Sequence, residues 1–458
     1  MKRLGFGIMA LLLAGTVTMA AETKMESTPI AGLTMEDLDK RVEDKVNTML
    51  VNNDSLEVHG YARAGVLVNQ NGKQVTGGGG NEGTPSRKLV GRLGNETDNY
   101  WDLHIKKKFK TDTGVWSNFT LTMAQHDNNR ERLNEGNGSA DVAVRQIFAE
   151  MGGFAWNPDL TYWVGKRFYG QQDIHITDFM FTDYAGTGAG IQGLANGKLD
   201  LAYVAGSSWQ DDLLTGNGKL MSHNFIASYT LDNWKLDGMV MFADGNADYL
   251  NKGTGTSPAT DIDYAETGYQ ATATYNNSSF YGIENGFSKA FFQAGYGLGS
   301  GTSGLGHTQW NWTTMQKDIS YRVGTFGVTE GEKWSFMPET VLQYDVNDAS
   351  SNDNKLTASA AIRPVYKVVD NFSIQFELGL GYEGFDKNKD KNGVERNGMF
   401  YKATVAPTIS LNDSFWGRPQ LRTFVSFVGW TSDVAPDTKT VAGSDNELRA
   451  GVQAEIWF

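Results

Sequence analysis

A chain of 458 residues that contains no cysteine cannot depend on disulfide bonds or on thiolate metal sites for its fold. Its net charge of -13 argues against polyanionic partners such as nucleic acid. The 54 glycines, the 9 prolines and the aromatic content of 12% are typical of a large β-structure with many short strands.

The N-terminal residues have the pattern of an export signal. Lys2 and Arg3 precede an apolar run from Leu4 to Leu13, and small residues follow as far as Ala21. A run of about 10 apolar residues is too short to span a bilayer, which needs roughly 20. Residues 1–21 are therefore predicted to be a signal peptide rather than a membrane anchor.

Residues 22–55 are predicted to form a polar linker followed by one short amphipathic helix in the periplasm. Thr34 and Asp37 have a spacing similar to a capping box. Apolar residues then recur every three or four positions, at Met35, Leu38, Val42, Val46 and Met49. This stripe covers only about two heptads, so the pattern fits both a trimeric coiled coil and a helix docked on the rest of the chain.

From residue 56 to residue 458 the apolar residues recur with a period of two. The last strand shows this most clearly, with apolar residues at Leu448, Ala450, Val452, Ala454, Ile456 and Phe458 and Arg449, Gly451, Gln453, Glu455 and Trp457 between them. A closed barrel in lipid needs this alternation and leaves no unpaired strand edge in the hydrocarbon. Residues 56–458 are thus predicted to be an antiparallel transmembrane β-barrel, and the length fits about 16–18 strands.

Several aromatic residues occur on the polar face of the predicted strands. Trp457 shares its face with Arg449 and Glu455, while Tyr61 lies beside Arg63. Tyr100 falls on the same face as Asp102, His104 and Lys106. Sugar rings stack their C–H faces on aromatic rings while their hydroxyls hydrogen-bond to charged groups, so this combination favours carbohydrate binding. The alternative is that these rings belong to the interfacial girdles of the barrel or pack beneath an infolded loop.

The sequence resembles the maltoporin (sugar porin) family, including its sucrose-porin branch. The segments that carry this resemblance are His59-Gly60-Tyr61-Ala62-Arg63, Arg92-Leu93-Gly94-Asn95-Glu96, Trp163-Val164-Gly165-Lys166-Arg167-Phe168-Tyr169, Gly188-Ala189-Gly190, Ile362-Arg363-Pro364-Val365-Tyr366-Lys367, Trp416-Gly417-Arg418-Pro419 and Glu455-Ile456-Trp457-Phe458. The resemblance implies a homotrimer of barrels of about 18 strands, each with a lumenal aromatic slide and flanking ionic groups.

The resemblance also implies the residues that contact the sugar. The slide positions are Tyr61, Tyr100, Phe287, Trp416 and Trp457. The flanking polar track comprises Arg63, Arg92, Asp102, Arg145 and Asp178.

This sequence departs from the family at the channel entrance and at the constriction. Asp127-Asn128-Asn129-Arg130 occupies the loop in which maltoporins carry a tryptophan that begins the slide of a neighbouring subunit. The constriction tyrosine falls on Met180 and a nearby arginine on Gln171, whereas Asp173 and His175 keep the pattern. Since methionine is flexible and lacks the hydroxyl, we expect weaker selection for linear maltodextrins and passage of bulkier disaccharides.

The sequence therefore predicts an outer-membrane porin for facilitated diffusion of maltose, maltodextrins or other oligosaccharides such as sucrose. A general diffusion porin without sugar specificity is the alternative, and a barrel enzyme is a third reading that no recognisable catalytic spacing supports. The expected partners are carbohydrate solutes, outer-membrane lipid, two further copies of the chain and a periplasmic sugar-binding protein. No cofactor is expected, and the six histidines have no metal-binding spacing.

Overall fold

The computed structural model describes residues 55–75, 85–96, 98–127, 142–207, 221–243, 262–311, 313–348, 353–387, 397–431 and 445–458. The predicted signal peptide and the helix predicted within residues 22–55 lie outside the described residues. The entrance residues 128–130 also lie outside them.

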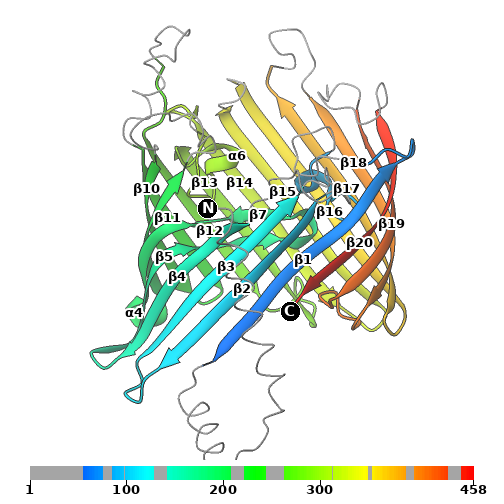
Figure 1. Cartoon of the computed structure of the whole chain (residues 1–458). Helices are drawn as coiled ribbons and strands as arrows, with labels where there is room; N and C mark the ends of the chain where they lie inside the picture. Colours follow the sequence, from blue (N-terminus) through cyan, green and yellow to red (C-terminus); the bar gives the residue numbers. More distant parts are fainter. Residues whose placement is uncertain are drawn as a thin grey trace, which may run out of the picture. The chain divides into compact units, whose positions relative to one another are not determined.

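The described residues form a closed antiparallel barrel of 18 strands, as predicted (Figure 1). Each wall strand pairs with the next along the chain, and β20 returns to pair with β1, where Tyr61 lies opposite Trp457. The wall strands are β1 (Leu56–Asn69), β2 (Asn99–Lys110), β3 (Trp116–Asp127), β4 (Ala143–Phe154), β5 (Asn157–Arg167), β8 (Gly186–Gly193), β9 (Leu199–Ser207), β10 (Met221–Leu231), β11 (Trp234–Phe242), β12 (Thr267–Asn277), β13 (Gly286–Gly297), β14 (Ile319–Glu330), β15 (Trp334–Asp348), β16 (Asp353–Val369), β17 (Phe372–Phe385), β18 (Gly398–Ser410), β19 (Gln420–Trp430) and β20 (Asn446–Trp457).

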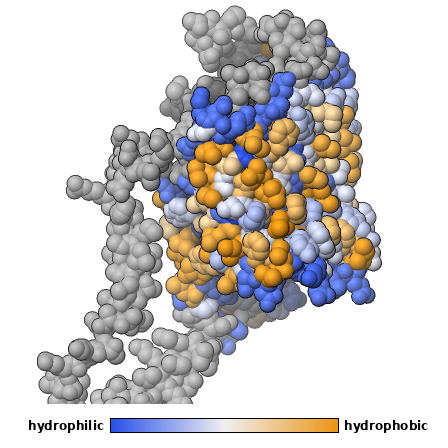
Figure 2. Space-filling model, turned by 90° about the vertical axis from the view of Figure 1, so that its right-hand side faces the viewer, coloured by the Kyte–Doolittle hydropathy of each residue, from blue (hydrophilic) through white to orange (hydrophobic). Residues whose placement is uncertain are grey.

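The alternation along the strands separates an apolar exterior from a polar interior. In β20 the side chains of Leu448 and Val452 are 47% and 48% exposed, whereas Arg449 and Glu455 are each 1% exposed. This is the reverse of a water-soluble protein, and it follows because lipid solvates the outer face. Figure 2 shows the resulting hydrophobic band on the outer wall, with hydrophilic side chains above and below it.

Three connections place residues inside the barrel. The first carries the short helix α3 (Arg87–Val90), and the second, between β5 and β8, carries the β6 (Gln172–Ile174) and β7 (Phe179–Thr182) hairpin with the 3-10 turn η1 (His175–Thr177). We call residues 168–185 the constriction loop. The third, between β13 and β14, carries α6 (Gly301–Gly304). One further short helix, α4 (Leu194–Gly197), connects β8 to β9.

Backbone hydrogen bonds join these three connections to one another. The Arg92 N–H donates to the Ile176 carbonyl at 2.8 Å, and the Asp183 N–H donates to the Gly306 carbonyl at 2.8 Å. Helix α3 approaches the wall closely at β17, where a Cβ on Gly381 would lie 2.7 Å from the Leu89 side chain. The constriction loop is therefore fixed from two sides.

One face of the constriction loop is buried against the wall, which leaves its other face to the lumen. Ile174, Ile176 and Phe181 pack into an apolar cluster on the inner surface of β13–β16, and Phe181 stacks on Phe291 with ring centres 4.1 Å apart. No helix in the described ranges is both long and apolar enough to span a membrane.

Candidate functional site

Four of the five predicted slide rings follow one another along the inner wall. The ring centres of Tyr100 and Tyr61 are 5.9 Å apart, those of Tyr61 and Trp457 are 6.4 Å apart, and those of Trp457 and Trp416 are 6.5 Å apart. The four rings are half-buried, so part of each faces the lumen. Trp416 comes from the turn between β18 and β19, and the other three come from β2, β1 and β20.

The fifth predicted ring, Phe287 on β13, belongs to a different contact group. It lies edge-on to Phe326 at 6.3 Å, and together with Trp416 it packs against the apolar cluster beneath the constriction loop. Phe287 thus shares an apolar cluster with Trp416, the ring at one end of the row.

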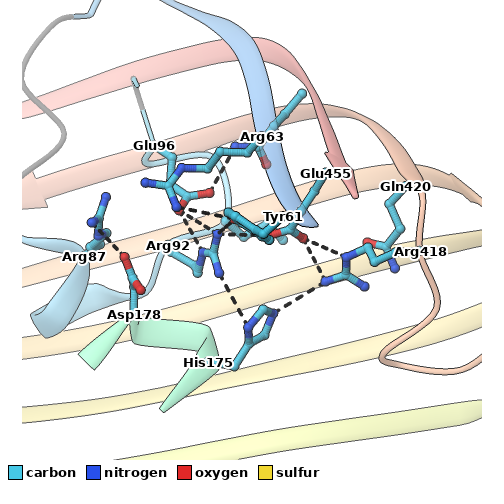
Figure 3. Close-up of polar contacts among 12 residues, drawn as sticks. Tyr61, Arg63, Arg87, Arg92, Glu96, His175, Asp178, Arg418, Gln420 and Glu455 are labelled. Carbon is cyan, nitrogen blue, oxygen red and sulfur yellow. Dashed lines mark hydrogen bonds and ion pairs between the residues drawn. The ribbon is translucent and has the colours of Figure 1, made fainter. Parts of the chain in front are cut away.

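The carboxylate of Glu455 is the centre of an ionic network beside these rings (Figure 3). Arg92 Nη2 donates to Glu455 Oε1 at 2.9 Å, and Arg418 Nε donates to Oε2 at 2.8 Å. Arg422 also pairs with Oε2. Three guanidiniums on one carboxylate leave it fully coordinated, which fixes the positions of the side chains around it.

Arg63 and Arg92, both predicted for the polar track, are buried and engaged with protein groups. Arg63 pairs with Asp98 at 2.5 Å, and Arg92 pairs with Glu96 at 2.8 Å. Burial raises the pKa of Glu96, but Arg92 and Arg63 outweigh it and hold that pKa below its usual range. These arginines therefore hold the wall and rings in place more than they offer free donors to a solute.

The hydroxyl of Tyr61 is also fully engaged. It donates to Glu455 Oε1 at 3.0 Å and accepts from Arg92 Nη2 at 2.8 Å and Arg63 Nη1 at 3.4 Å. Because the hydroxyl is used within the protein, Tyr61 presents its ring face and not a hydrogen-bonding group to the lumen.

His175 of the constriction loop lies edge-on between two slide rings. Its ring centre is 5.1 Å from that of Trp416 and 5.9 Å from that of Trp457. Its nitrogens face the guanidiniums of Arg92 and Arg418, each at 3.5 Å (Figure 3). Burial, and then the charge of Arg92, lower the pKa of His175 well below its usual range, so the ring is neutral at physiological pH.

The remaining constriction residues lie around the β6–β7 hairpin. Asp173 and Met180 are register partners, and Asp178 adopts a left-handed conformation with a φ of 48° and pairs with Arg87 at 2.7 Å. Burial and the neighbouring charge of Asp178 raise the pKa of Asp173. The Gln171 amide donates to Asp183 at 3.0 Å, within the same loop.

Two predicted track residues lie nearer to Tyr100. Asp102 accepts from the Tyr100 hydroxyl at 3.0 Å and from the Tyr61 backbone N–H at 3.1 Å. Arg145 is exposed, with its Cζ 5.4 Å from the centre of the Phe168 ring.

Several residues of this site were not predicted. Glu96, Arg418 and Glu455 lie in the segments that carry the family resemblance, so a closer look at those segments could have identified them as residues of the site. Arg87 had no such signal, because its partner Asp178 is 91 positions away along the chain and only the fold brings the two together. In the described ranges no group of three histidine, aspartate or glutamate side chains is arranged to hold a metal ion.

An 18-stranded barrel with an apolar exterior, a polar interior and an infolded loop defines a membrane channel of the porin class. The model of the LamB porin family matches residues 56–458. The chain belongs to this family and is an outer-membrane porin.

Individual relatives cover most of the chain. It is 30% identical over 429 residues to a maltoporin of Photobacterium profundum, an alignment that covers 88% of this chain and 94% of the relative. It is 28% identical to a maltoporin of Hahella chejuensis, with 89% and 94% covered. Among solved structures, OccK1 (OpdK) of Pseudomonas aeruginosa gives a TM-score of 0.44 at 12% identity, with 88% of this chain and 99% of that chain covered.

Proposed function

We propose that this porin carries carbohydrates across the outer membrane by facilitated diffusion along the row of rings. The row from Tyr100 through Tyr61 and Trp457 to Trp416 is the observation that carries the proposal. Its centre-to-centre spacings of 5.9, 6.4 and 6.5 Å let a sugar chain slide from one ring to the next without leaving apolar contact.

In this proposal the polar groups beside the rings form hydrogen bonds with the hydroxyls of the sugar. Asp102, Asp173 and Asp178 keep lumenal exposure, whereas Arg63 and Arg92 hold the wall. A solute that leaves bulk water then exchanges its hydrogen bonds for those of the wall. The names of the maltoporin relatives support the same substrate class.

The constriction is proposed to select weakly for linear maltodextrins and to pass bulkier disaccharides such as sucrose. Met180 supplies no hydroxyl there, and the Gln171 amide is occupied by Asp183. Block by maltohexaose at micromolar concentration would contradict this part of the proposal.

Conductance of the purified full-length protein in planar bilayers tests the proposal. Maltose, sucrose and maltotriose should each interrupt the ionic current transiently, whereas glycine should not. Trp457→Ala and Tyr100→Ala should each weaken the block by roughly three- to tenfold, the effect of losing one stacked ring. Trp334→Ala is the matched control because Trp334 is exposed on the outer face of β15.

A general diffusion porin would behave differently in the same measurement. If no sugar interrupts the current, or if the slide variants and the Trp334 control behave alike, the rings have no transport role. The proposed homotrimer is tested separately, by the mass of the protein in detergent. A contact with a periplasmic sugar-binding protein likewise remains a proposal.

A further inference from the structure

Two cations lie close to one aromatic ring of the constriction loop. The Lys88 Nζ of helix α3 is 5.9 Å from the centre of the Phe179 ring, and the Arg322 Cζ of β14 is 5.0 Å from the same centre. Phe179 packs on the same apolar cluster as Trp416, the last ring of the row described above.

Arg322 differs from the other buried arginines in what balances its charge. Arg63, Arg92, Arg363, Arg418, Arg422 and Arg449 each pair with a carboxylate. Arg322 is 1% exposed and, within the described ranges, donates only to neutral oxygens: Gln343 at 2.9 Å, Gln293 at 2.8 Å and the Leu305 carbonyl at 3.1 Å. Its Nη2 has no hydrogen-bond partner there. The charge of Asp345 favours the charged form of Arg322. A buried guanidinium that makes no hydrogen bond to a carboxylate is costly, so an anion near its Nη2 would be stabilising.

The acids nearest to the pair, Asp178 and Asp345, act on it through their charge but are engaged by other groups. Asp178 is engaged by Arg87 at 2.7 Å, and Asp345 accepts from Ser320 at 2.5 Å and from Gln343 at 2.8 Å. Lys88 is exposed and has no ion pair in the part of the chain that the structure describes. A positive charge therefore remains available at the constriction.

The nearby titratable groups are consistent with a positive local potential. Loss of bulk solvation inside the barrel lowers the pKa of Lys88, and Arg322 and Arg87 lower it further. Burial lowers the pKa of His307 to about 3, with added effects of Arg322 and Lys88, so this histidine is neutral. A bound anion would relieve the repulsion among these cations.

We propose that Lys88 and Arg322, both close to the Phe179 ring, form an anion-binding subsite that selects saccharides carrying a carboxylate or phosphate group. Lys88 contacts the anionic group, and the buried Arg322 adds a second positive charge near it. Neighbouring rings of the slide hold the sugar moiety. This inference deepens the proposed function and rests on it, because it names the class of sugar that the path prefers.

Sugars matched in linkage and size test this subsite. Trigalacturonate and maltotriose are both α-1,4-linked trisaccharides, and only the first is charged. In planar bilayers we expect trigalacturonate to bind the wild-type channel more tightly than maltotriose. Raising KCl from about 0.1 M to about 1 M should weaken the binding of trigalacturonate and leave the binding of maltotriose unchanged. Glucose 6-phosphate compared with glucose shows whether a phosphate is accepted in place of a carboxylate.

Variants of Lys88 assign the effect to the subsite. Lys88→Gln should weaken the binding of trigalacturonate by roughly three- to tenfold and leave the binding of maltotriose unchanged. Lys88→Arg should restore the binding of trigalacturonate. Lys106→Gln is the matched control, because it removes a half-exposed lysine on the polar face of β2, one that is paired with Glu150 at 3.7 Å. This control variant should leave the ratio of the binding constants of trigalacturonate and maltotriose unchanged.

The outcomes separate this inference from the proposed function. If maltotriose block depends on Trp457 but Lys88→Gln leaves trigalacturonate unaffected, the subsite is absent and the sugar path stands. An equal loss in Lys88→Gln and Lys106→Gln would also overturn the subsite, because it would show only a general effect of lumenal charge. If neither sugar binds the wild-type channel, both proposals fail.

Discussion

The guanidinium of Arg418 lies over the indole of Trp457, with its Cζ 3.9 Å from the ring centre. The same side chain donates to Glu455 at 2.8 Å. One arginine therefore holds a ring of the proposed slide and joins that ring to the ionic network of the wall. Cation–ring contacts of this kind contribute about 0.5–2 kcal/mol.

Replacing this arginine should weaken sugar binding through the position of the ring. Arg418→Met is expected to weaken maltotriose block by roughly two- to fivefold, because the indole loses the group that orients it. Arg422→Met is the control, since Arg422 pairs with the same Glu455 and has no recorded contact with a slide ring in the described residues. An equal effect in both variants would assign the loss to Glu455 and not to the ring.

The buried Arg63–Asp98 pair should matter for stability. Arg63→Met leaves Asp98 and Glu96 buried with fewer positive partners, and we expect a loss of about 3–5 kcal/mol in the free energy of unfolding, measured by urea unfolding in detergent. Lys108→Met removes a half-exposed partner of Glu57, a pair that water screens, and should have a much smaller effect. Similar losses in the two variants would show that burial does not determine how much an ion pair contributes to the free energy of unfolding.

A tyrosine at the constriction should increase selection for linear sugars. Met180→Tyr adds a ring and a hydroxyl to the β6–β7 hairpin, so we expect tighter block by maltohexaose and a lower single-channel conductance. Met180→Leu is the control for volume without a hydroxyl and should leave both close to wild type. If Met180→Tyr has the affinity and conductance of wild type, residue 180 does not line the narrowest part of the path.

His175 should make the protein less stable in mild acid. Its pKa in the folded protein lies well below the usual value of 6.5, because of burial and the guanidiniums of Arg92, Arg363 and Arg418, which outweigh Glu455. Below pH 6.5 the unfolded chain binds a proton at this residue and the folded chain does not. The free energy of unfolding should then fall by up to about 1.4 kcal/mol for each pH unit until the folded-state pKa is reached.

Comparing the wild type with His175→Gln isolates this contribution. The difference between their free energies of unfolding should be constant from pH 8 to pH 7 and should change as the pH falls towards 5, with the wild type losing more. Parallel profiles down to pH 5 would show that His175 titrates equally in the folded and unfolded states.

The period of two in the sequence was sufficient to predict the barrel and the direction in which side chains point. Residues such as Leu448 and Arg449 alternate because lipid lies on one side of a strand and water on the other, and this constraint acts at every position. The family resemblance added the slide positions, four of which the structure places in one row. Neither source showed that Arg63 and Arg92 are held by Asp98, Glu96 and Glu455.

The sequence by itself determined the class of the protein, because the choice between lipid and water is made residue by residue and leaves a local pattern. Only the tertiary structure decided which charged side chains form ion pairs with one another. Lys88, Phe179 and Arg322 come from two infolded loops and one wall strand, and ion pairing depends on distances of a few ångströms that no spacing along the chain encodes.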